Sequence, residues 1–276
     1  MVTAASVSLL TEEQIGQFHK DGYLVLRGFF TPEEIAEIRE TFMAQNAEGP
    51  VPGLSEISAS YAPTDPLSFY PRMMHPHRHP DLPVGPLALR CMLDGRIECV
   101  LRALFADEPI AAQSMFYFKP PGARGQDLHQ DNYYLRVKPG TCIAAWLAVD
   151  AADPENGGLV VVPGSNTLDI VCPERADPSV FFTTDHVSVP KGLKELPLHL
   201  EAGDMLFFNG SLIHGSYPNQ SERFRRAFIC HYVPAASAEV SRGYRPLLRF
   251  NGEEVAMNDA TGGGPCGVPH EDLPPH

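Results

Sequence analysis

Apolar positions in the first part of the chain recur with the period of a helix. A capping box at residues 11–14, "TEEQ", predicts a helix that runs to about Asp21, because its first and last side chains satisfy each other's backbone N–H groups. A second box at residues 31–34, "TPEE", opens another helix, whose apolar stripe is Ile35, Ile38 and Phe42. Between the two, "GYLVLRGFF" favours a short strand. Residues 46–80 are typical of a loop, and a third helix is expected over about 86–105.

Further along the chain the apolar positions follow a period of two. In "TCIAAWLAVD" two sets of side chains alternate, Ile143, Ala145, Leu147 and Val149 with Cys142, Ala144, Trp146 and Ala148. Such alternation marks a strand with two distinct faces. Similar short runs follow one another, separated by turn signals such as "KPG", "ENGG", "PGS" and "AGD". Many short strands with polar turns are typical of a sandwich or jelly roll.

These patterns predict a single domain over residues 1–276, mainly β with flanking helices around a jelly-roll core. We expect a helical N-terminal part at about 1–108, the jelly-roll core at about 109–235 and a loop-rich tail at about 236–276. From about Phe250 the tail is expected to be loop or partly disordered. Because 43% of the 276 residues are hydrophobic, the chain can bury a substantial core.

Charge and composition exclude several classes of partner. The formal net charge of −13 and the pI of about 5.2 give a surface that repels phosphate backbones, so nucleic-acid binding is not expected. No apolar run approaches the ~20 residues that a membrane helix needs. The N-terminus lacks the basic start of a signal peptide, so we expect a cytoplasmic protein. We expect it to be either a monomer or a homodimer. None of the six cysteines forms a C-x-x-C pair, and we expect reduced, mostly buried thiols.

The stretch "DLHQDNYY" places a histidine and an aspartate two residues apart. If residues 128–137 form a strand, His129 and Asp131 project from the same face. Taken alone, this motif is more often a hydrogen-bonded polar pair than a metal site. His214 follows a separate apolar strand, and a hairpin over residues 214–226 would return Arg225 or Arg226 to its side. The combination is much more specific than any of its parts.

Two histidines and one carboxylate on one side of a metal are the ligand set of non-haem Fe(II) oxygenases. Three protein ligands leave half of an octahedral coordination sphere open for a 2-oxo acid and for O2. A nearby arginine would pair with the distal carboxylate of 2-oxoglutarate, because its planar guanidinium suits bidentate binding. These residues therefore predict Fe(II) as cofactor, with 2-oxoglutarate and O2 as cosubstrates.

At this point the chain resembles a known family. "FKPPGARGQDLHQDNYYL", "AAWLAVDAADPENGGLVVVPGS" and "HGSYPNQSERFRRA" are similar to segments of the phytanoyl-CoA dioxygenase family of Fe(II)/2-oxoglutarate oxygenases, and the resemblance covers roughly residues 9–235. It implies a double-stranded β-helix fold. It also implies a set of site residues: His129, Asp131 and His214 as iron ligands, Arg225 and Ser216 at the carboxylate of 2-oxoglutarate, and Met115 and Trp146 lining the cosubstrate site.

The sequence departs from the family pattern in two places. The usual "PGSH" is "PGSN" here, ending in Asn166, so no histidine role is carried over at that position. A basic residue that contacts 2-oxoglutarate in some relatives has no matching position upstream of the metal motif.

The implied activity is hydroxylation of an aliphatic carbon of a small molecule, for example a natural product or an amino-acid-like compound. Asp131 favours hydroxylation over halogenation, because related halogenases replace this aspartate by a small residue and so free a position for chloride. Desaturation, epoxidation and ring formation stay open, since the same iron chemistry leads to each. A non-catalytic metal-binding jelly roll is the alternative from another class.

Several further residues have two interpretations each. Gln113 either reaches the substrate or cofactor or faces solvent. By strand parity Tyr133 shares the face of the metal ligands and is a candidate wall of the substrate pocket, with Tyr117 as a weaker candidate. The run "HPHRHP", which contains His75, His77 and His79, is interpreted as an exposed turn, with a substrate entrance or a second metal site as alternatives. Three other histidines are interpreted as structural: His186, His199 and His231.

Overall fold

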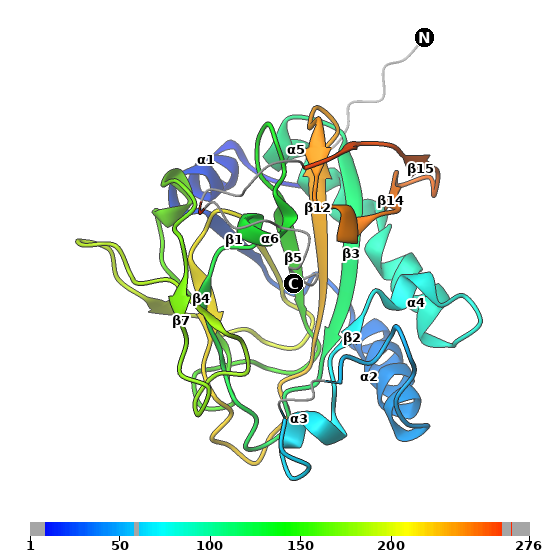
Figure 1. Cartoon of the computed structure of the whole chain (residues 1–276). Helices are drawn as coiled ribbons and strands as arrows, with labels where there is room; N and C mark the ends of the chain where they lie inside the picture. Colours follow the sequence, from blue (N-terminus) through cyan, green and yellow to red (C-terminus); the bar gives the residue numbers. More distant parts are fainter. Residues whose placement is uncertain (1–8, 58–60, 261–265, 267–276) are drawn as a thin grey trace.

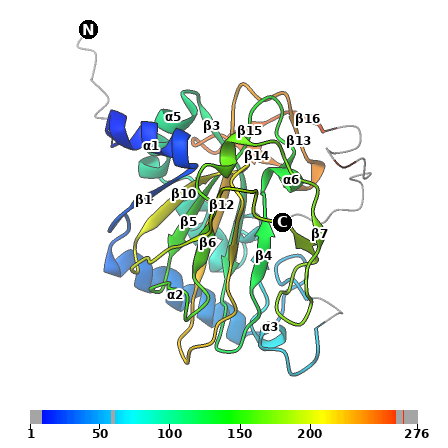
Figure 2. The ribbon, with the colours of Figure 1, turned by 90° about the vertical axis from the view of Figure 1, so that its left-hand side faces the viewer.

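Two antiparallel sheets form the jelly roll of the computed structural model, which describes residues 9–57, 61–260 and 266 (Figure 1). The major sheet has eight strands. Seven of them lie in the order β1 (Tyr23–Leu26), β10 (Met205–Asn209), β5 (Ile143–Ala148), β12 (Ala227–Pro234), β3 (Pro109–Tyr117), β14 (Leu247–Leu248) and β15 (Glu254–Val255). The eighth, β2 (Met73–Met74), also pairs with β3. The minor sheet has the order β4 (Gln126–His129), β11 (His214–Ser216), β6 (Leu159–Val161) and β9 (Leu196–Pro197). Figure 2 looks onto the minor sheet, with the major sheet behind it.

The period of two places the two faces of each major-sheet strand in different environments. In β5, Ile143, Ala145 and Leu147 belong to the core beneath the helices, whereas Ala144 and Trp146 belong to the core between the sheets. The alternation expected from the sequence is therefore confirmed, and the jelly-roll expectation with it. Because both faces are covered, the strand is buried along its whole length.

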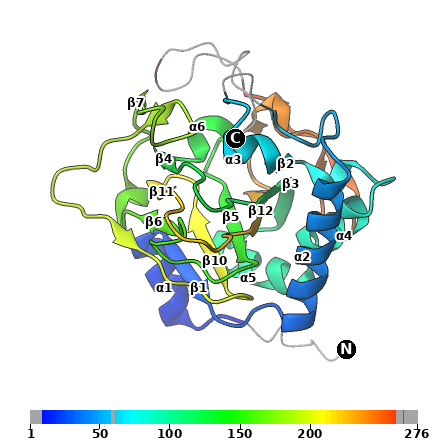
Figure 3. The same cartoon turned by 90° about the horizontal axis from the view of Figure 1, so that it is seen from below.

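The helices pack on the outer face of the major sheet. They are α1 (Glu12–Asp21), α2 (Pro32–Ala47), α4 (Val84–Met92) and α5 (Gly95–Phe105), and their apolar side chains join one core cluster with β3, β5, β10 and β12. Figure 3 shows α2 and α4 on the outside of β3. Both expected capping boxes are present, with Thr11 and Thr31 as N-caps. The stacked rings of Phe42 and Phe116, with centroids 4.1 Å apart, join α2 to β3.

The expected single helix over 86–105 is wrong in one respect, because it is two helices. Asp94 interrupts it: its carboxylate accepts a hydrogen bond from the backbone N–H of Arg96 at 2.8 Å and so begins α5 as a new helix. Asp94 thus separates α4 from α5, and both helices contact β3.

Segments outside the expected core also contribute strands. β1 and β2 come from the expected helical part, and β14 and β15 come from the expected tail. Thus the described part of the tail is not merely loop, while most of residues 261–276 lie outside the described residues. The remaining elements are α3 (Pro66–Phe69), η1 (Pro76–Arg78), α6 (Asn132–Leu135), η2 (Ser165–Thr167), β7 (Glu174–Arg175), β8 (Asp185–His186), β13 (Glu239–Val240), η3 (Arg242–Tyr244) and β16 (Asn258–Asp259).

The expectation of six reduced cysteines is wrong for two of them. Cys172 and Cys266 form a disulfide across 94 residues of sequence, a pairing that no local spacing announces. The four others are free thiols, and Cys91, Cys142 and Cys230 are buried as expected. Within the described ranges, none of the helices has the length and apolar character needed to cross a membrane.

Candidate active site

The three expected metal ligands converge on one point between the sheets. His129 ends β4 and His214 begins β11, and the two residues face each other in the register of the minor sheet. Oδ1 of Asp131 lies 3.5 Å from Nε2 of each histidine. One ligand atom from each residue lies within 4.8 Å of the others, and all three side chains are buried. Across the described ranges, this is the one group of three such side chains with metal-binding geometry.

Asp131 reaches this point from the N-terminal end of a helix, and not from the strand that was expected. The strand ends at His129, and Asp131 has helical backbone angles at the start of α6. Strand parity therefore does not apply beyond His129. Tyr133, which parity would place in the pocket, lies in α6 and packs in a separate cluster with Tyr134 and Leu135. The chain turns here because the backbone N–H of Asn132 donates to the carbonyl of Gly210, at 2.8 Å, beyond the end of β10.

The backbone orients both imidazoles. Nδ1 of His129 lies 2.7 Å from the carbonyl of Asp127, and Nδ1 of His214 lies 3.0 Å from the carbonyl of Leu212. A carbonyl only accepts hydrogen bonds, so each Nδ1 carries the proton and each Nε2 presents a lone pair toward Asp131. Burial, with the neighbouring His129, lowers the pKa of His214 to about 4, which keeps it neutral at physiological pH.

His231 is a neighbour of Asp131 that the sequence interpretation missed. Its Nε2 lies 2.9 Å from Oδ2 of Asp131, on β12 of the opposite sheet. Burial alone would raise the pKa of Asp131, but the surrounding histidines outweigh it and hold that pKa well below its usual range. His231 is thus a partner of a candidate ligand, a contact that its interpretation as a structural residue did not include. No spacing could have found it, because 100 residues separate the two.

A cavity opens at the three ligands. Both sheets line it, with apolar walls from Met115, Tyr117, Trp146, Leu159, Phe208 and Ile229 and polar groups from Gln126, His129, Asp131, His214 and His231. Met115, Trp146 and Tyr117 therefore line this cavity, and their roles toward cosubstrate and substrate stay predictions. Gln113 is fully buried opposite His231 in the strand register, so the solvent-facing alternative is wrong for it.

Arg225 lies beside the cavity, although the expected hairpin is wrong. β11 and β12 belong to different sheets, and the segment between them crosses from one sheet to the other. The guanidinium of Arg225 is buried, lies 5.5 Å from the centre of the Trp146 ring, and donates from Nε to the carbonyl of Gly157 at 3.0 Å. Its Nη1 has no hydrogen-bond partner within the described part of the chain. Arg226, by contrast, forms a two-point ion pair with Asp150 at 2.7 and 3.0 Å.

Lys119 is a second residue that the sequence interpretation missed. It follows β3, is 3% exposed, and its Nζ lies 2.8 Å from Oγ of Ser216 and 3.2 Å from the carbonyl of Gly157. Burial, followed by the charge of Arg225, lowers its pKa well below the usual range. The available signal was a lysine at the end of an apolar strand, in "MFYFKPP".

The "HPHRHP" run is not an exposed turn. His75 and His77 are 7% and 8% exposed, and η1 packs against β3 and α4. Nδ1 of His77 lies 2.6 Å from Oγ of Ser114. Burial lowers the pKa of both histidines to about 3. Within the described part of the chain, these histidines form no metal-binding group of the kind found at the three ligands.

Comparison with known proteins agrees with this geometry. The sequence matches the phytanoyl-CoA dioxygenase (PhyH) family over residues 18–227. It is 28% identical to phytanoyl-CoA dioxygenase 1 of Oryza sativa subsp. japonica, covering 84% of this chain and 92% of that protein. It is 24% identical to the mouse (Mus musculus) phytanoyl-CoA dioxygenase domain-containing protein 1, covering 86% and 94%.

Solved structures share the fold at lower identity. EctD from S. alaskensis, crystallised with 2-oxoglutarate and 5-hydroxyectoine, superposes with a TM-score of 0.68 at 21% identity, covering 85% of this chain and 80% of that one. The epimerase SnoN, in complex with Fe3+, alpha ketoglutarate and nogalamycin RO, superposes with a TM-score of 0.65 at 19% identity, covering 85% and 86%. Since the family match spans most of the sequence, this chain belongs to the phytanoyl-CoA dioxygenase (PhyH) family.

Proposed function

We propose that this protein, an Fe(II)- and 2-oxoglutarate-dependent dioxygenase, hydroxylates an aliphatic carbon of a small molecule and releases succinate and CO2. In this proposal His129, Asp131 and His214 hold the iron. Arg225 and Ser216 bind the distal carboxylate of 2-oxoglutarate, and Trp146 and Met115 line its site. The observation that carries the proposal is the meeting of the three donors in a buried cavity.

The donor set fits the metal. Two neutral imidazoles and one carboxylate, all on one side of the cavity, match the ligands that Fe(II) oxygenases use. Each imidazole is held by its Nδ1, so the Nε2 atoms are available as ligands without any change of tautomer. When bound, the iron supplies the coupling of O2 reduction to oxidation of the 2-oxo acid and of the substrate.

The chain's own residues orient the reactants and exclude water. Among the described residues, Nη1 of Arg225 is a buried donor without an acceptor, which supports an anionic ligand beside the Trp146 wall of the cavity. The apolar walls from Leu159, Phe208 and Ile229 suit an aliphatic substrate and keep water from the reacting carbon. The carboxylate of Asp131 would hold the iron where halogenases have a small residue and leave room for a halide, so hydroxylation is favoured.

The substrate class follows from charge and from the solved relatives. A net charge of −13 disfavours nucleic acids and large anionic substrates. The ligands in the EctD and SnoN crystals, 5-hydroxyectoine and nogalamycin RO, are small molecules. We therefore include a compact amino-acid-like compound or a natural product in the proposal.

The test is a substrate screen with isotopically labelled O2. The protein, Fe(II) and 2-oxoglutarate are incubated with a panel of such compounds, and succinate and product masses are measured. One labelled oxygen atom in succinate and one in the product would support hydroxylation, whereas a product that loses two hydrogens would indicate desaturation or ring closure instead. The Asp131→Ala variant should form no labelled product. If the wild-type protein bound iron but neither bound nor consumed 2-oxoglutarate, a non-catalytic metal-binding module would be the better description.

A further inference from the structure

We propose that two buried asparagines, Asn156 and Asn219, are positioning residues that hold the guanidinium of Arg225 in place for the distal carboxylate of 2-oxoglutarate. This inference rests on the proposed function, because it concerns the arginine that binds the cosubstrate there. Both side chains are uncharged and lie outside the lining of the cavity, so they act on the ligand only through the arginine.

Arg225 lies in a stretch of chain that crosses from one sheet to the other. β11 of the minor sheet ends at Ser216, β12 of the major sheet begins at Ala227, and residues 217–226 between them are called the crossing segment here. The crossing segment belongs to neither sheet, so strand pairing does not fix its backbone. Side-chain contacts must therefore determine where the buried Arg225 stands.

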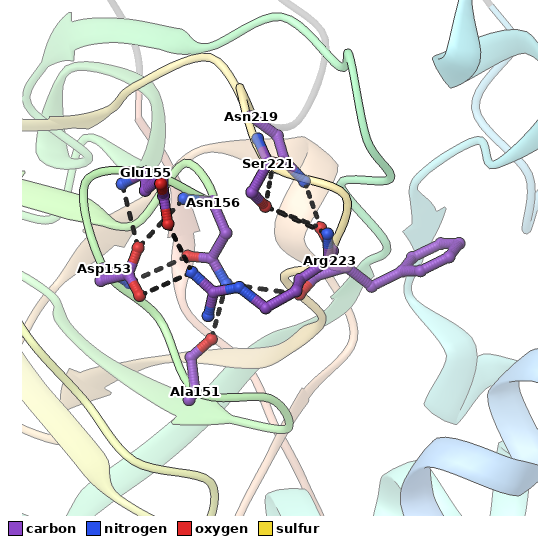
Figure 4. Close-up of polar contacts among 8 residues, drawn as sticks. Ala151, Asp153, Glu155, Asn156, Asn219, Ser221 and Arg223 are labelled. Atoms are coloured by element: carbon purple, nitrogen blue, oxygen red, sulfur yellow. Dashed lines mark hydrogen bonds and ion pairs between the residues drawn. The ribbon is translucent and has the colours of Figure 1, made fainter.

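Asn219 holds the backbone of the crossing segment. Its Oδ1 accepts hydrogen bonds from the backbone N–H and the hydroxyl of Ser221, at 3.0 and 2.9 Å, and its Nδ2 donates to the carbonyl of Arg223 at 2.7 Å (Figure 4). Nδ2 also donates to the carbonyl of Lys119 at 3.1 Å, the same carbonyl that accepts from the backbone N–H of Arg225. The amide thus uses both donors and both lone pairs, and it fixes the chain two residues before Arg225.

Asn156 holds the "DPENGG" turn, which lies beside the crossing segment. Its Oδ1 accepts from the backbone N–H of Asp153 at 2.9 Å, and its Nδ2 donates to the carbonyl of Ala151 at 2.7 Å (Figure 4). A longer contact of 3.4 Å joins Nδ2 to the carbonyl of Phe224, in the crossing segment. One amide therefore closes the turn and also reaches the chain that carries the arginine.

The carbonyl that follows Asn156 receives the side chain of Arg225. Nε of Arg225 donates to the carbonyl of Gly157 at 3.0 Å. Gly157 has a φ of +81°, and a Cβ there would lie 2.7 Å from the carbonyl oxygen of Tyr217, so the turn approaches the crossing segment this closely only because the residue is a glycine. Asn156 thus fixes the acceptor of the arginine side chain, whereas Asn219 fixes the arginine backbone.

Ion pairs at the surface join the same two segments but hold them less firmly. Arg223 pairs with Asp153 at 2.9 Å and with Glu155 at 3.2 Å (Figure 4). The Arg223 side chain is 49% exposed, and ion pairs in water contribute little to stability. The two asparagines are 0% and 1% exposed, so loss of either amide would leave buried carbonyls without donors, which is more costly.

The guanidinium of Arg225 depends on this support. It lies 5.5 Å from the centre of the Trp146 ring, and its Nη1 has no hydrogen-bond partner among the described residues. Two parallel hydrogen bonds to a carboxylate require the planar guanidinium to stand in a fixed orientation. Movement of the crossing segment would therefore weaken binding of 2-oxo acids that carry a distal carboxylate, and not of those that lack one.

The test compares two ligands on two variants, Asn219→Ala and Asn156→Ala. Binding is measured by calorimetry with Mn(II) in place of iron, using 2-oxoglutarate and its analogue without the distal carboxylate, 2-oxovalerate. We expect each variant to bind 2-oxoglutarate about 10-fold more weakly, no more weakly than Arg225→Met, and to bind 2-oxovalerate unchanged. Equal losses for both ligands, or no loss for either, would overturn the proposal, even if the variants unfold at a lower temperature.

A double variant shows whether the asparagines act through the arginine. In the Arg225→Met background, Asn219→Ala should cause no further loss of 2-oxoglutarate affinity, because the group that it positions is no longer present. A second loss of about 10-fold in the double variant would contradict the proposal, since Asn219 would then affect the ligand by another route.

A milder substitution and a control complete the design. If an alanine variant does not fold, serine replaces it, because a hydroxyl keeps one donor, and a smaller loss confined to 2-oxoglutarate is expected. Asn166→Ala is the matched control: its side chain also donates to a backbone carbonyl, that of His19 at 3.1 Å, but between η2 and α1, and both affinities should stay unchanged. If wild-type protein binds Mn(II) but no 2-oxoglutarate, or if Arg225→Met binds it normally, the proposed function fails, and not this inference alone.

Discussion

Nε2 of His231 lies 2.9 Å from Oδ2 of Asp131, while Oδ1 of the same carboxylate lies 3.5 Å from Nε2 of each of the two candidate ligand imidazoles. The Asp131 carboxylate is thus shared between two sheets: its backbone follows β4, and its hydrogen-bond partner comes from β12. In the proposed metal site, Oδ1 of Asp131 would therefore be the oxygen available to the iron.

His231→Phe should weaken metal binding by about 10- to 100-fold, because it removes the group that orients Asp131 while keeping a ring in the same space. Titration of the metal-free protein with Fe(II) without oxygen would measure this. His231→Gln keeps a donor near the Nε2 position and should recover part of the loss. Unchanged affinity in the Phe variant would mean that Asp131 needs no such partner.

Arg225→Met should raise the dissociation constant for 2-oxoglutarate, at a cost of about 1.5–3 kcal/mol for the lost charge-assisted hydrogen bonds. Arg226→Met is the matched control, since its side chain is engaged with Asp150. The control should bind 2-oxoglutarate normally. If the two variants behaved in the opposite way, the choice between the adjacent arginines would be reversed.

The buried His75 and His77 should make the fold acid-sensitive. Burial lowers their pKa to about 3, below the ordinary value of 6.5, so the unfolded chain takes up protons first as the pH falls. The stability they contribute is complete above about pH 6.5 and is lost progressively toward about pH 3. Between about pH 7.5 and about pH 5.5 each histidine should account for a loss of about 1.3 kcal/mol.

Urea unfolding at these two pH values tests this with His77→Asn, which keeps a contact to Ser114 in place of Nδ1. Between the two pH values, the free energy of unfolding of this variant should fall by about 1.3 kcal/mol less than that of the wild type. His19→Asn, at an exposed position, is the control and should not alter the difference. An unchanged pH dependence in the His77 variant would mean that this imidazole titrates alike in the folded and unfolded chain.

The Cys172–Cys266 disulfide predicts a specific thiol count. Thiol titration in denaturant should find four reactive cysteines before reduction and six afterwards. Six thiols before reduction, in protein purified without reductant, would contradict the pairing. The Cys172→Ser variant, also unreduced, should then show five, because Cys266 loses its partner.

Much of the architecture was readable from the sequence, since it depends on neighbours a few residues apart. The capping boxes at Thr11 and Thr31 and the alternation in β5 are local patterns, and the structure contains each of them. Local patterns failed where a short polar residue redirects the chain. Asp94 divides a helix, and at Asp131 the backbone leaves the strand, which removed Tyr133 from the expected pocket.

The sequence by itself determined the residue types of the candidate site: two histidines, a carboxylate, an arginine and a serine in recognisable spacings. Only the tertiary structure decided which other groups meet them. His231 reaches Asp131, and Lys119 reaches Ser216, because segments of the two sheets face each other. The physical reason is that such contacts depend on the pairing and facing of strands about 100 residues apart, which no local periodicity specifies.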